Sequence, residues 1–258
     1  MKVVLLAGGL GTRMREETEF RPKPMVEIGG KPALWHIMKV FAHHGHTDFV
    51  ICGGYRIDVI RDYFLNYGAR NSDFSVTLGN RDSVIFHGSY DEFEWTVTVA
   101  DTGPETPTGG RIHAIQKYVG ADDFLCTYGD GIADVDISKL LSSHATSRKQ
   151  ATVTLAKPRS RFGVVKVGME GTVSEFVEKP TTDDFVNIGY FVFSQGIFDY
   201  LSPSSVLEKE PLANIARNGQ LGAFVHSGFW QPMDTLSEAQ ILGELWREGT
   251  APWAVWQQ

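Results

Sequence analysis

The stretch VVLLAGGLGTR, residues 3–13, places a short apolar run directly before a loop that contains three glycines. The uninterrupted apolar residues at 3–7 predict a buried β-strand. Glycine adopts positive φ without strain and leaves backbone N–H groups uncovered, so the loop at 8–11 is suited to an anion. We therefore expect a strand that delivers an anion-binding turn at its carboxyl end, where open α/β sheets bind ligands.

Strand and helix signals alternate through the first half of the chain. Apolar residues recur at helical spacing in two segments, 33–41 and 56–66. Buried or β-branched runs predict strands at 48–52, 74–78, 83–87, 95–99 and 123–128. Such alternation predicts an α/β fold with a Rossmann-like, mostly parallel sheet that has helices on both faces.

The second half of the chain has more strand signals and fewer helix signals. Strand-like stretches lie at 151–156, 163–167, 172–178 and 187–193, and helices are expected near 207–217 and 235–248. No low-complexity linker separates the halves. We therefore expect a single domain over residues 1–258, with a nucleotide-binding half at 1–135 and a strand-rich half at 136–258 that adds a second wall to the cleft.

The overall charge limits the classes of ligand. The net charge of −7 argues against a general nucleic-acid binder, which would present a basic face. Positive charge is instead local, because Arg13, Arg15, Arg21 and Lys23 crowd one short stretch. The apolar run at 3–7 is too short for a secretory signal core, and no run approaches the roughly 18 apolar residues of a membrane span. We expect a cytoplasmic protein with no membrane partner.

The glycine loop fits neither of two common nucleotide-binding motifs. A dinucleotide fingerprint that begins at Gly9 and Gly11 would need glycine at position 14, where Met14 stands. The Gly-Lys-Ser/Thr ending of a P-loop is also missing. A structural turn is the alternative to phosphate binding, but Lys23 stands between two prolines that fix its backbone and would aim its ammonium group.

Two aspartates are candidate magnesium ligands. Asp130 lies between two glycines just after the predicted strand 123–128, and Asp234 comes just before the predicted helix 235–248. An Asp-Gly turn is the structural alternative for Asp130, and a helix N-cap is the alternative for Asp234. Magnesium is commonly held by one or two carboxylates plus phosphate oxygens, so the pair would suffice.

Five segments together resemble a known family: LAGGLGTR at 6–13, RPKPMVEIGGKP at 21–32, YGDG at 128–131, VEKP at 177–180 and FWQPMD at 229–234. In this order they resemble the sugar-1-phosphate nucleotidyltransferases, and the likeness runs from residue 1 almost to the end. The segments TGGR at 108–111 and GFWQPMDT at 228–235 are similar to the branch that uses CTP and glucose 1-phosphate. The resemblance implies a nucleotidyltransferase-type sheet with a sugar-binding extension in the second half.

The resemblance also implies roles for individual residues. Arg13, Lys23 and Asp130 would be catalytic, and Asp130 and Asp234 would hold Mg²⁺. The nucleotide would contact Leu6, Ala7, Gly8, Gly9, Gly11, Thr12, Arg13, Lys23, Thr108, Gly109, Arg111 and Gly129. The sugar and its phosphate would contact Glu178, Lys179, Asn187 and Gly189. An exposed Glu-Lys pair on a solvated surface is the structural alternative for Glu178 and Lys179.

The implied reaction is an in-line attack of a sugar 1-phosphate on the α-phosphorus of a nucleoside triphosphate, with loss of diphosphate. The family also implies a homo-oligomer. Two prolines, Pro104 and Pro107, precede TGGR and depart from the family pattern, so base selection stays open between CTP and dTTP, UTP or GTP. A non-enzymatic alternative is a nucleotide-sugar sensor without turnover. The presence of Lys23, Asp130 and Asp234 argues against it.

Overall fold

The computed structural model describes residues 1–79, 83–160 and 162–257. The side chains of Arg13, Arg15 and Glu16 lie outside what it describes. None of the helices in these ranges is long and apolar enough to cross a bilayer.

Within the described ranges, the body of the molecule is built on a seven-stranded sheet with the order β14-β10-β13-β8-β1-β4-β7. The strands are β1 (Lys2–Ala7), β4 (Asp48–Gly53), β7 (Thr96–Asp101), β8 (Phe124–Tyr128), β10 (Ala151–Ala156), β13 (Val186–Phe193) and β14 (Leu221–Val225). Only β13 runs antiparallel to its neighbours β8 and β10. The other pairs in this sheet are parallel, which confirms the predicted α/β fold with a mostly parallel sheet.

The side chains of β1 alternate between two hydrophobic cores on opposite faces of the sheet. Val3 and Leu5 belong to one core, and Val4 and Leu6 belong to the other. Successive residues of a strand point to opposite faces, so an all-apolar run such as this one buries both. The predicted buried strand at 3–7 is therefore confirmed.

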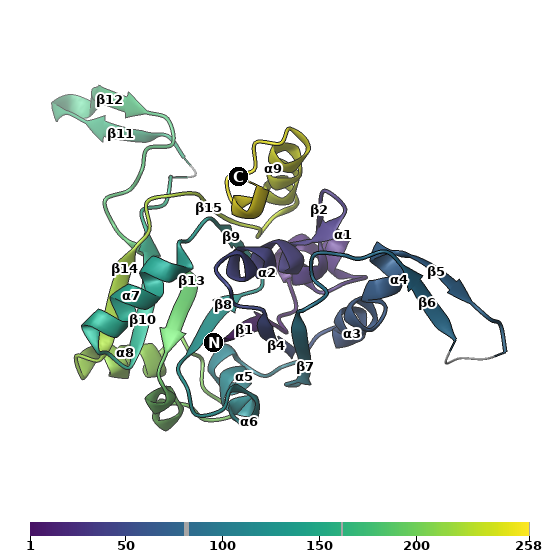
Figure 1. Cartoon of the computed structure of the whole chain (residues 1–258). Helices are drawn as coiled ribbons and strands as arrows, with labels where there is room; N and C mark the ends of the chain where they lie inside the picture. The colour runs from purple at the N-terminus through teal and green to yellow at the C-terminus, as the bar shows by residue number, and fades with distance from the viewer. Residues whose placement is uncertain (80–82, 161, 258) are drawn as a thin grey trace.

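Helices cover both faces of this sheet (Figure 1). The core that contains Leu5 is closed by α2 (Ala33–His43), α3 (Ile57–Leu65) and α9 (Leu236–Arg247). The opposite core is closed by α5 (Thr108–Ala114) and α8 (Glu210–Arg217). Helix α7 (Ile137–Ser147) also packs on the core that contains Leu5, through Ile137 and Leu140. Shorter helical segments are α1 (Arg15–Thr18), α4 (Tyr67–Asn71), α6 (Gln116–Val119), η1 (Thr12–Met14), η2 (Lys23–Met25), η3 (Met169–Gly171), η4 (Gln195–Tyr200) and η5 (Val255–Gln257).

Two hairpins extend from the body in different directions (Figure 1). The first arm pairs β5 (Asp73–Val76) with β6 (Val84–His87), and the second arm pairs β11 (Val164–Val167) with β12 (Val173–Val177). Every residue of these four strands is exposed. Smaller ladders join β9 (Gly131–Ala133) to β15 (Trp230–Pro232) and β2 (Glu27–Ile28) to β3 (Lys31–Pro32).

The chain reverses its direction of travel across the sheet at β1. From β1 it continues outward through β4 to β7, and then it returns to β8 on the other side of β1. Leu6 pairs with Tyr128, and the N–H of Gly129 donates to the carbonyl of Leu6 over 3.0 Å. The glycine loop after β1 and the segment after β8 are thus side by side at a topological switch point, the usual ligand position in such sheets.

Candidate functional site

A cleft of about 400 Å³ lies at the carboxyl ends of β1 and β8. It gathers most of the residues that the sequence marks as a site. Those that line it are Leu6, Ala7, Gly8, Gly9, Gly11, Thr12, Lys23, Thr108, Arg111, Asp130 and Asp234. Pro24, Thr106, Pro107 and Tyr128 complete the wall. Residues far apart in the chain therefore form one basic and acidic surface around the glycine loop.

Lys23 is the best-placed cation in the cleft. It opens η2 between Pro22 and Pro24, and only 12% of its side chain is exposed. Its Nζ donates to Asp130 Oδ2 over 2.8 Å and to Asp234 Oδ1 over 2.5 Å. Burial lowers the pKa of Lys23, but the two carboxylates outweigh burial and the net pKa is raised. Lys23 therefore carries its positive charge at neutral pH.

The two carboxylates meet because β9 pairs with β15. Asp130 directly precedes β9, Asp234 follows β15 closely, and the N–H of Met233 donates to the carbonyl of Asp130 over 2.9 Å. Asp234 is not the N-cap of α9, so that structural alternative is wrong. Thr235 is the N-cap, in a capping box with Glu238, whose Oε2 also accepts from the N–H of Asp234 over 2.8 Å. The carboxylate of Asp234 is thus aimed into the cleft.

The pair Asp130 and Asp234 fits a magnesium ion by its chemistry. Both groups offer hard oxygen ligands, and both reach the same ammonium nitrogen, so they can reach one small cation. In the described part of the chain, no cluster of three or more His, Cys, Asp or Glu side chains is arranged for a metal. A cation held here would need further oxygen ligands from water or phosphate, which is how Mg²⁺ is usually bound.

Arg111 holds the glycine loop in place. Its buried guanidinium donates to the carbonyls of Gly8, Gly53, Gly103 and Pro104 and to the hydroxyl of Thr102, over 2.6 to 3.3 Å. A Cβ at Gly8 would lie 2.1 Å from Arg111 Nη1, so only glycine fits there. Within the described residues, no carboxylate oxygen comes within 4.0 Å of this guanidinium. Its charge is therefore solvated by carbonyl dipoles and favours an anion in the cleft.

Glu208, which the sequence did not reveal, accepts hydrogen bonds from two residues that line the cleft. Tyr128 Oη donates to Glu208 Oε1 over 2.5 Å, and Thr108 Oγ1 donates to Glu208 Oε2 over 2.7 Å. Burial and the nearby Glu208 raise the pKa of Tyr128. The Tyr128 ring fills the space above Gly189, where a Cβ would lie 2.2 Å from the ring. One carboxylate thus ties Thr108 of α5 to Tyr128 of β8, whose ring packs over Gly189.

Several predicted residues lie outside the cleft lining. Gly109 lies within α5, where a Cβ would come 2.8 Å from the carbonyl of Ser205, and Gly129 packs against Pro24. Asn187 accepts the N–H of Gly189 with its Oδ1 over 2.8 Å. Neither Gly109 nor Gly129 therefore lines the cleft, although each glycine supports one of its walls.

Glu178 and Lys179 follow β12 at the base of the second arm. Their side chains are 64% and 62% exposed, and neither lines the cleft. The structure therefore does not bring this pair to Lys23, and it leaves them on a solvated surface. Arg13 is in η1 beside the glycine loop, but its side chain lies outside the described part of the structure.

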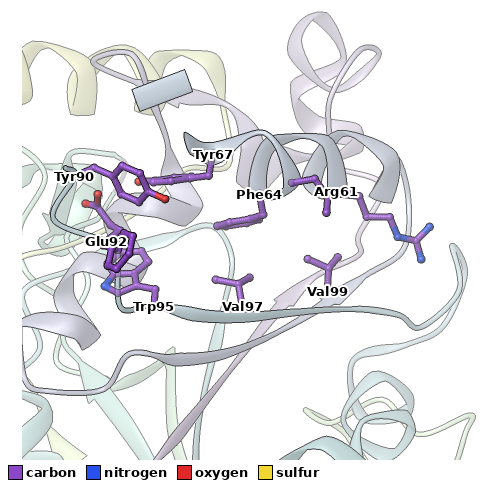
Figure 2. Close-up of a pocket in the computed structure, with 10 residues that line it drawn as sticks. Arg61, Phe64, Tyr67, Tyr90, Glu92, Trp95, Val97 and Val99 are labelled. Atoms are coloured by element: carbon purple, nitrogen blue, oxygen red, sulfur yellow. The ribbon is translucent and has the colours of Figure 1, made fainter. Parts of the chain in front are cut away.

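A second pocket, of about 490 Å³, lies between α3, α4 and β7 (Figure 2). Figure 2 shows the rings of Phe64, Tyr67 and Trp95 around it, with Val97 and Val99 on the sheet side. It is larger than the first cleft, but its lining contains one basic residue and no glycine loop. Its lining is suited to apolar contact and not to a polyphosphate, so the first cleft is the candidate site.

Comparisons with known proteins place the chain in a family and show which solved structures share its fold. The model of the nucleotidyl transferase family matches residues 2–231. The chain is 46% identical to the glucose-1-phosphate cytidylyltransferase of Salmonella typhi, with 100% of both proteins covered. It is 30% identical to the mannose-1-phosphate guanyltransferase of Gibberella zeae, over 97% of this chain and 66% of that protein. The solved structure of a UDP-glucose pyrophosphorylase with UDP-glucose has a TM-score of 0.70 at 16% identity and covers 96% of this chain and 98% of that one, which shows the same fold.

Proposed function

The chain belongs to the nucleotidyl transferase family, and we propose that it joins CTP to α-D-glucose 1-phosphate, giving CDP-glucose and diphosphate. It is a nucleotidyltransferase. The base and the sugar are supported by 46% identity along the full chain to a cytidylyltransferase, against 30% to a guanyltransferase. The observation that carries the chemistry is the meeting of Lys23, Asp130 and Asp234 beside the glycine loop.

The reaction brings two anions together. A phosphate oxygen of the sugar phosphate attacks the α-phosphorus in line, the new P–O bond forms, and the bond to the β-phosphate oxygen breaks to release diphosphate. Two unit negative charges about 4 Å apart repel by about 4 kcal/mol at the effective dielectric of a protein surface, so cations must intervene. We assign this work to Lys23 and to the buried charge of Arg111, which line the cleft, and to Arg13, which follows the glycine loop in η1.

The residues of the cleft also supply position. N–H groups of the loop at Gly8, Gly9 and Gly11 provide fixed dipoles toward phosphate oxygens. The sugar phosphate is already ionised at neutral pH, so its oxygen needs no strong general base. Catalysis is then positioning plus charge neutralisation, as in other phosphoryl transfers.

We propose Mg²⁺ as the cofactor, held by Asp130 and Asp234. When bound, the ion supplies positive charge that neutralises phosphate oxygens and helps to align them. On this proposal residues 1–135 bind the nucleotide and residues 136–258 bind the sugar phosphate, within one domain. Asn187 and Gly189 support the sugar side through Tyr128. Glu178 and Lys179 enter the proposal on the family resemblance alone.

We also propose a cytoplasmic homo-oligomer. A two-stranded hairpin is marginally stable by itself in water, yet both arms consist of exposed strands. Apolar side chains such as Phe176, 64% exposed, and Val165, 45% exposed, lie on the second arm. A second copy of the chain that covers this arm would stabilise it. Light scattering of the wild type and of Phe176→Glu tests this, and a wild type that is monomeric at micromolar concentration would contradict it.

The direct test of the reaction is diphosphate release with a panel of substrates. CTP, UTP, dTTP and GTP are each combined with glucose 1-phosphate and with mannose 1-phosphate. We expect kcat/KM to be highest for CTP with glucose 1-phosphate. A preference for another pair of nucleotide and sugar phosphate would change the proposed substrates, but the protein would remain a nucleotidyltransferase. Tight nucleotide binding with no diphosphate from any pair would favour a sensor and contradict the proposal.

A further inference from the structure

The Lys23 ammonium lies where a metal shared by Asp130 and Asp234 would need to be. Its nitrogen is 2.8 Å from Asp130 Oδ2 and 2.5 Å from Asp234 Oδ1, and the side chain is 12% exposed. A magnesium ion lies about 2.1 Å from each of its oxygen ligands, so an ion bound to these same two oxygens would overlap the ammonium. The side chain that the proposed function assigns to the phosphates therefore also competes with the metal.

The backbone around this cluster indicates which group moves. Asp130 and Asp234 are set by the β9–β15 ladder, by the N–H of Met233 on the carbonyl of Asp130, and by the capping box of α9. The Lys23 backbone is fixed by its two flanking prolines, but its four methylenes can swing. The movable part of the cluster is thus the ammonium.

We propose that Lys23 is an internal placeholder cation that keeps a divalent metal out of the Asp130–Asp234 pair until the nucleotide arrives. This inference rests on the proposed function. Metal alone must displace an ammonium that is mostly shielded from water, although the Asp130 side chain is 36% exposed, and the displaced ammonium then gives up both of these carboxylates. When triphosphate enters with the metal, its phosphates become the new partner of Lys23. Metal and nucleotide therefore bind with positive coupling, which is reciprocal by linkage.

The competition can be measured without turnover. Mn²⁺ serves as the probe, and its binding is followed by electron paramagnetic resonance or calorimetry in the absence of nucleotide. We expect Lys23→Met, which keeps the length of the side chain and removes its charge, to bind Mn²⁺ at least about tenfold more tightly than the wild type, within the usual range of such couplings. Lys23→Gln is the second variant. If one of the two variants fails to fold, Mn²⁺ binding can still be measured in the other.

Two controls locate the effect. Lys139→Met removes a surface lysine that pairs with Asp136 outside the cleft, and it should leave Mn²⁺ binding unchanged. The double variant Lys23→Met with Asp130→Asn should lose the gained affinity, because it removes one of the two carboxylates.

The outcomes separate this inference from the proposed function. If both Lys23 variants fold but bind Mn²⁺ no more tightly than the wild type, the placeholder role is wrong. That result leaves diphosphate release by the wild type, and hence the proposed function, intact. Tighter Mn²⁺ binding by the variants supports the placeholder role. It does so even if the wild type releases no diphosphate, a result that would show that the proposed function is wrong.

Discussion

Replacement of Arg111 by lysine tests whether its main work is to hold the glycine loop. The guanidinium makes five hydrogen bonds from a buried position, four to carbonyls and one to the Thr102 hydroxyl. A lysine ammonium has three donors on one atom and cannot reproduce this fork. At least two of the five hydrogen bonds are then lost, although the carbonyls of Gly8 and Gly53 keep the N–H groups of Tyr55 and Thr102 as donors. A hydrogen bond to a charged group contributes about 1.5–3 kcal/mol, so the free energy of unfolding should fall by about 3–6 kcal/mol.

The assay is equilibrium unfolding in urea, with the slope m required to stay constant between variants. Arg61→Lys is the matched control, because Arg61 is 46% exposed and pairs with Asp101 across 3.3 Å. It should change the stability by less than about 0.5 kcal/mol. We also expect the KM for CTP to rise in Arg111→Lys, since the carbonyl of Gly8 loses the guanidinium and keeps only the N–H of Tyr55 as donor. If Arg111→Lys is no less stable than Arg61→Lys, Arg111 does not hold the glycine loop in the way described.

Three further predictions follow from the cleft and its surroundings. Glu208→Ala should raise the KM for CTP about fivefold, because the Tyr128 and Thr108 hydroxyls lose a shared acceptor, whereas Glu208→Gln should restore most of the affinity. Equal effects of the two variants would contradict this positioning role. Burial lowers the pKa of His226, but its partners, chiefly Asp134, raise it above 6.5 overall. The charged imidazole therefore stabilises the folded state fully below pH 6.5, and this contribution is lost as the pH rises through the folded pKa. Between pH 6 and pH 9, the urea midpoint of the wild type should fall by more than that of His226→Gln. A pH dependence shared by both proteins would contradict the assignment. Chelation of divalent metal should abolish diphosphate release, and added Mg²⁺ should restore it; undiminished release in excess chelator would remove the metal from the proposal.

The parts of the fold that were predicted depend on signals that are local in the sequence. The buried strand at 3–7, its glycine loop and the strand at 123–128 are consecutive apolar runs with turn residues at their ends. A parallel sheet brings such carboxyl ends together, so the positions of Gly8 and Asp130 in one cleft follow from the pattern. Lys23 was singled out by its flanking prolines and by the family resemblance.

Two elements of the second half were missed for physical reasons. Helix α7 is rich in serine and threonine, which form helices weakly, and it is supported by the Asp136 cap and by burial of Ile137 and Leu140. Strand β14 reads LGAFV, without clear alternation, and it forms because Ala151 and its neighbours in β10 offer a parallel edge. Both depend on tertiary contacts more than on local propensity.

The site details that were missed depend on partners distant in the chain. Glu208 is 80 residues from Tyr128 and 100 from Thr108, and nothing around it marks it as a partner of these two cleft residues. Arg111 was expected at the nucleotide, and it does line the cleft, but its contacts are to carbonyls, one of them 103 residues away. Glu178 and Lys179 were expected at the sugar, but in the structure their side chains are exposed at the base of the second arm.

The central claim is that the charges of Lys23 and Asp130 beside the glycine loop drive transfer at the α-phosphorus. The most direct measurement is kcat for diphosphate release from CTP and glucose 1-phosphate by Lys23→Ala and Asp130→Ala, each shown to be folded by its urea midpoint. Loss of one preorganised charge-stabilising group should lower kcat by at least about 100-fold. Turnover within a few-fold of the wild type in either variant would contradict the role given to that residue, and in both it would contradict the account.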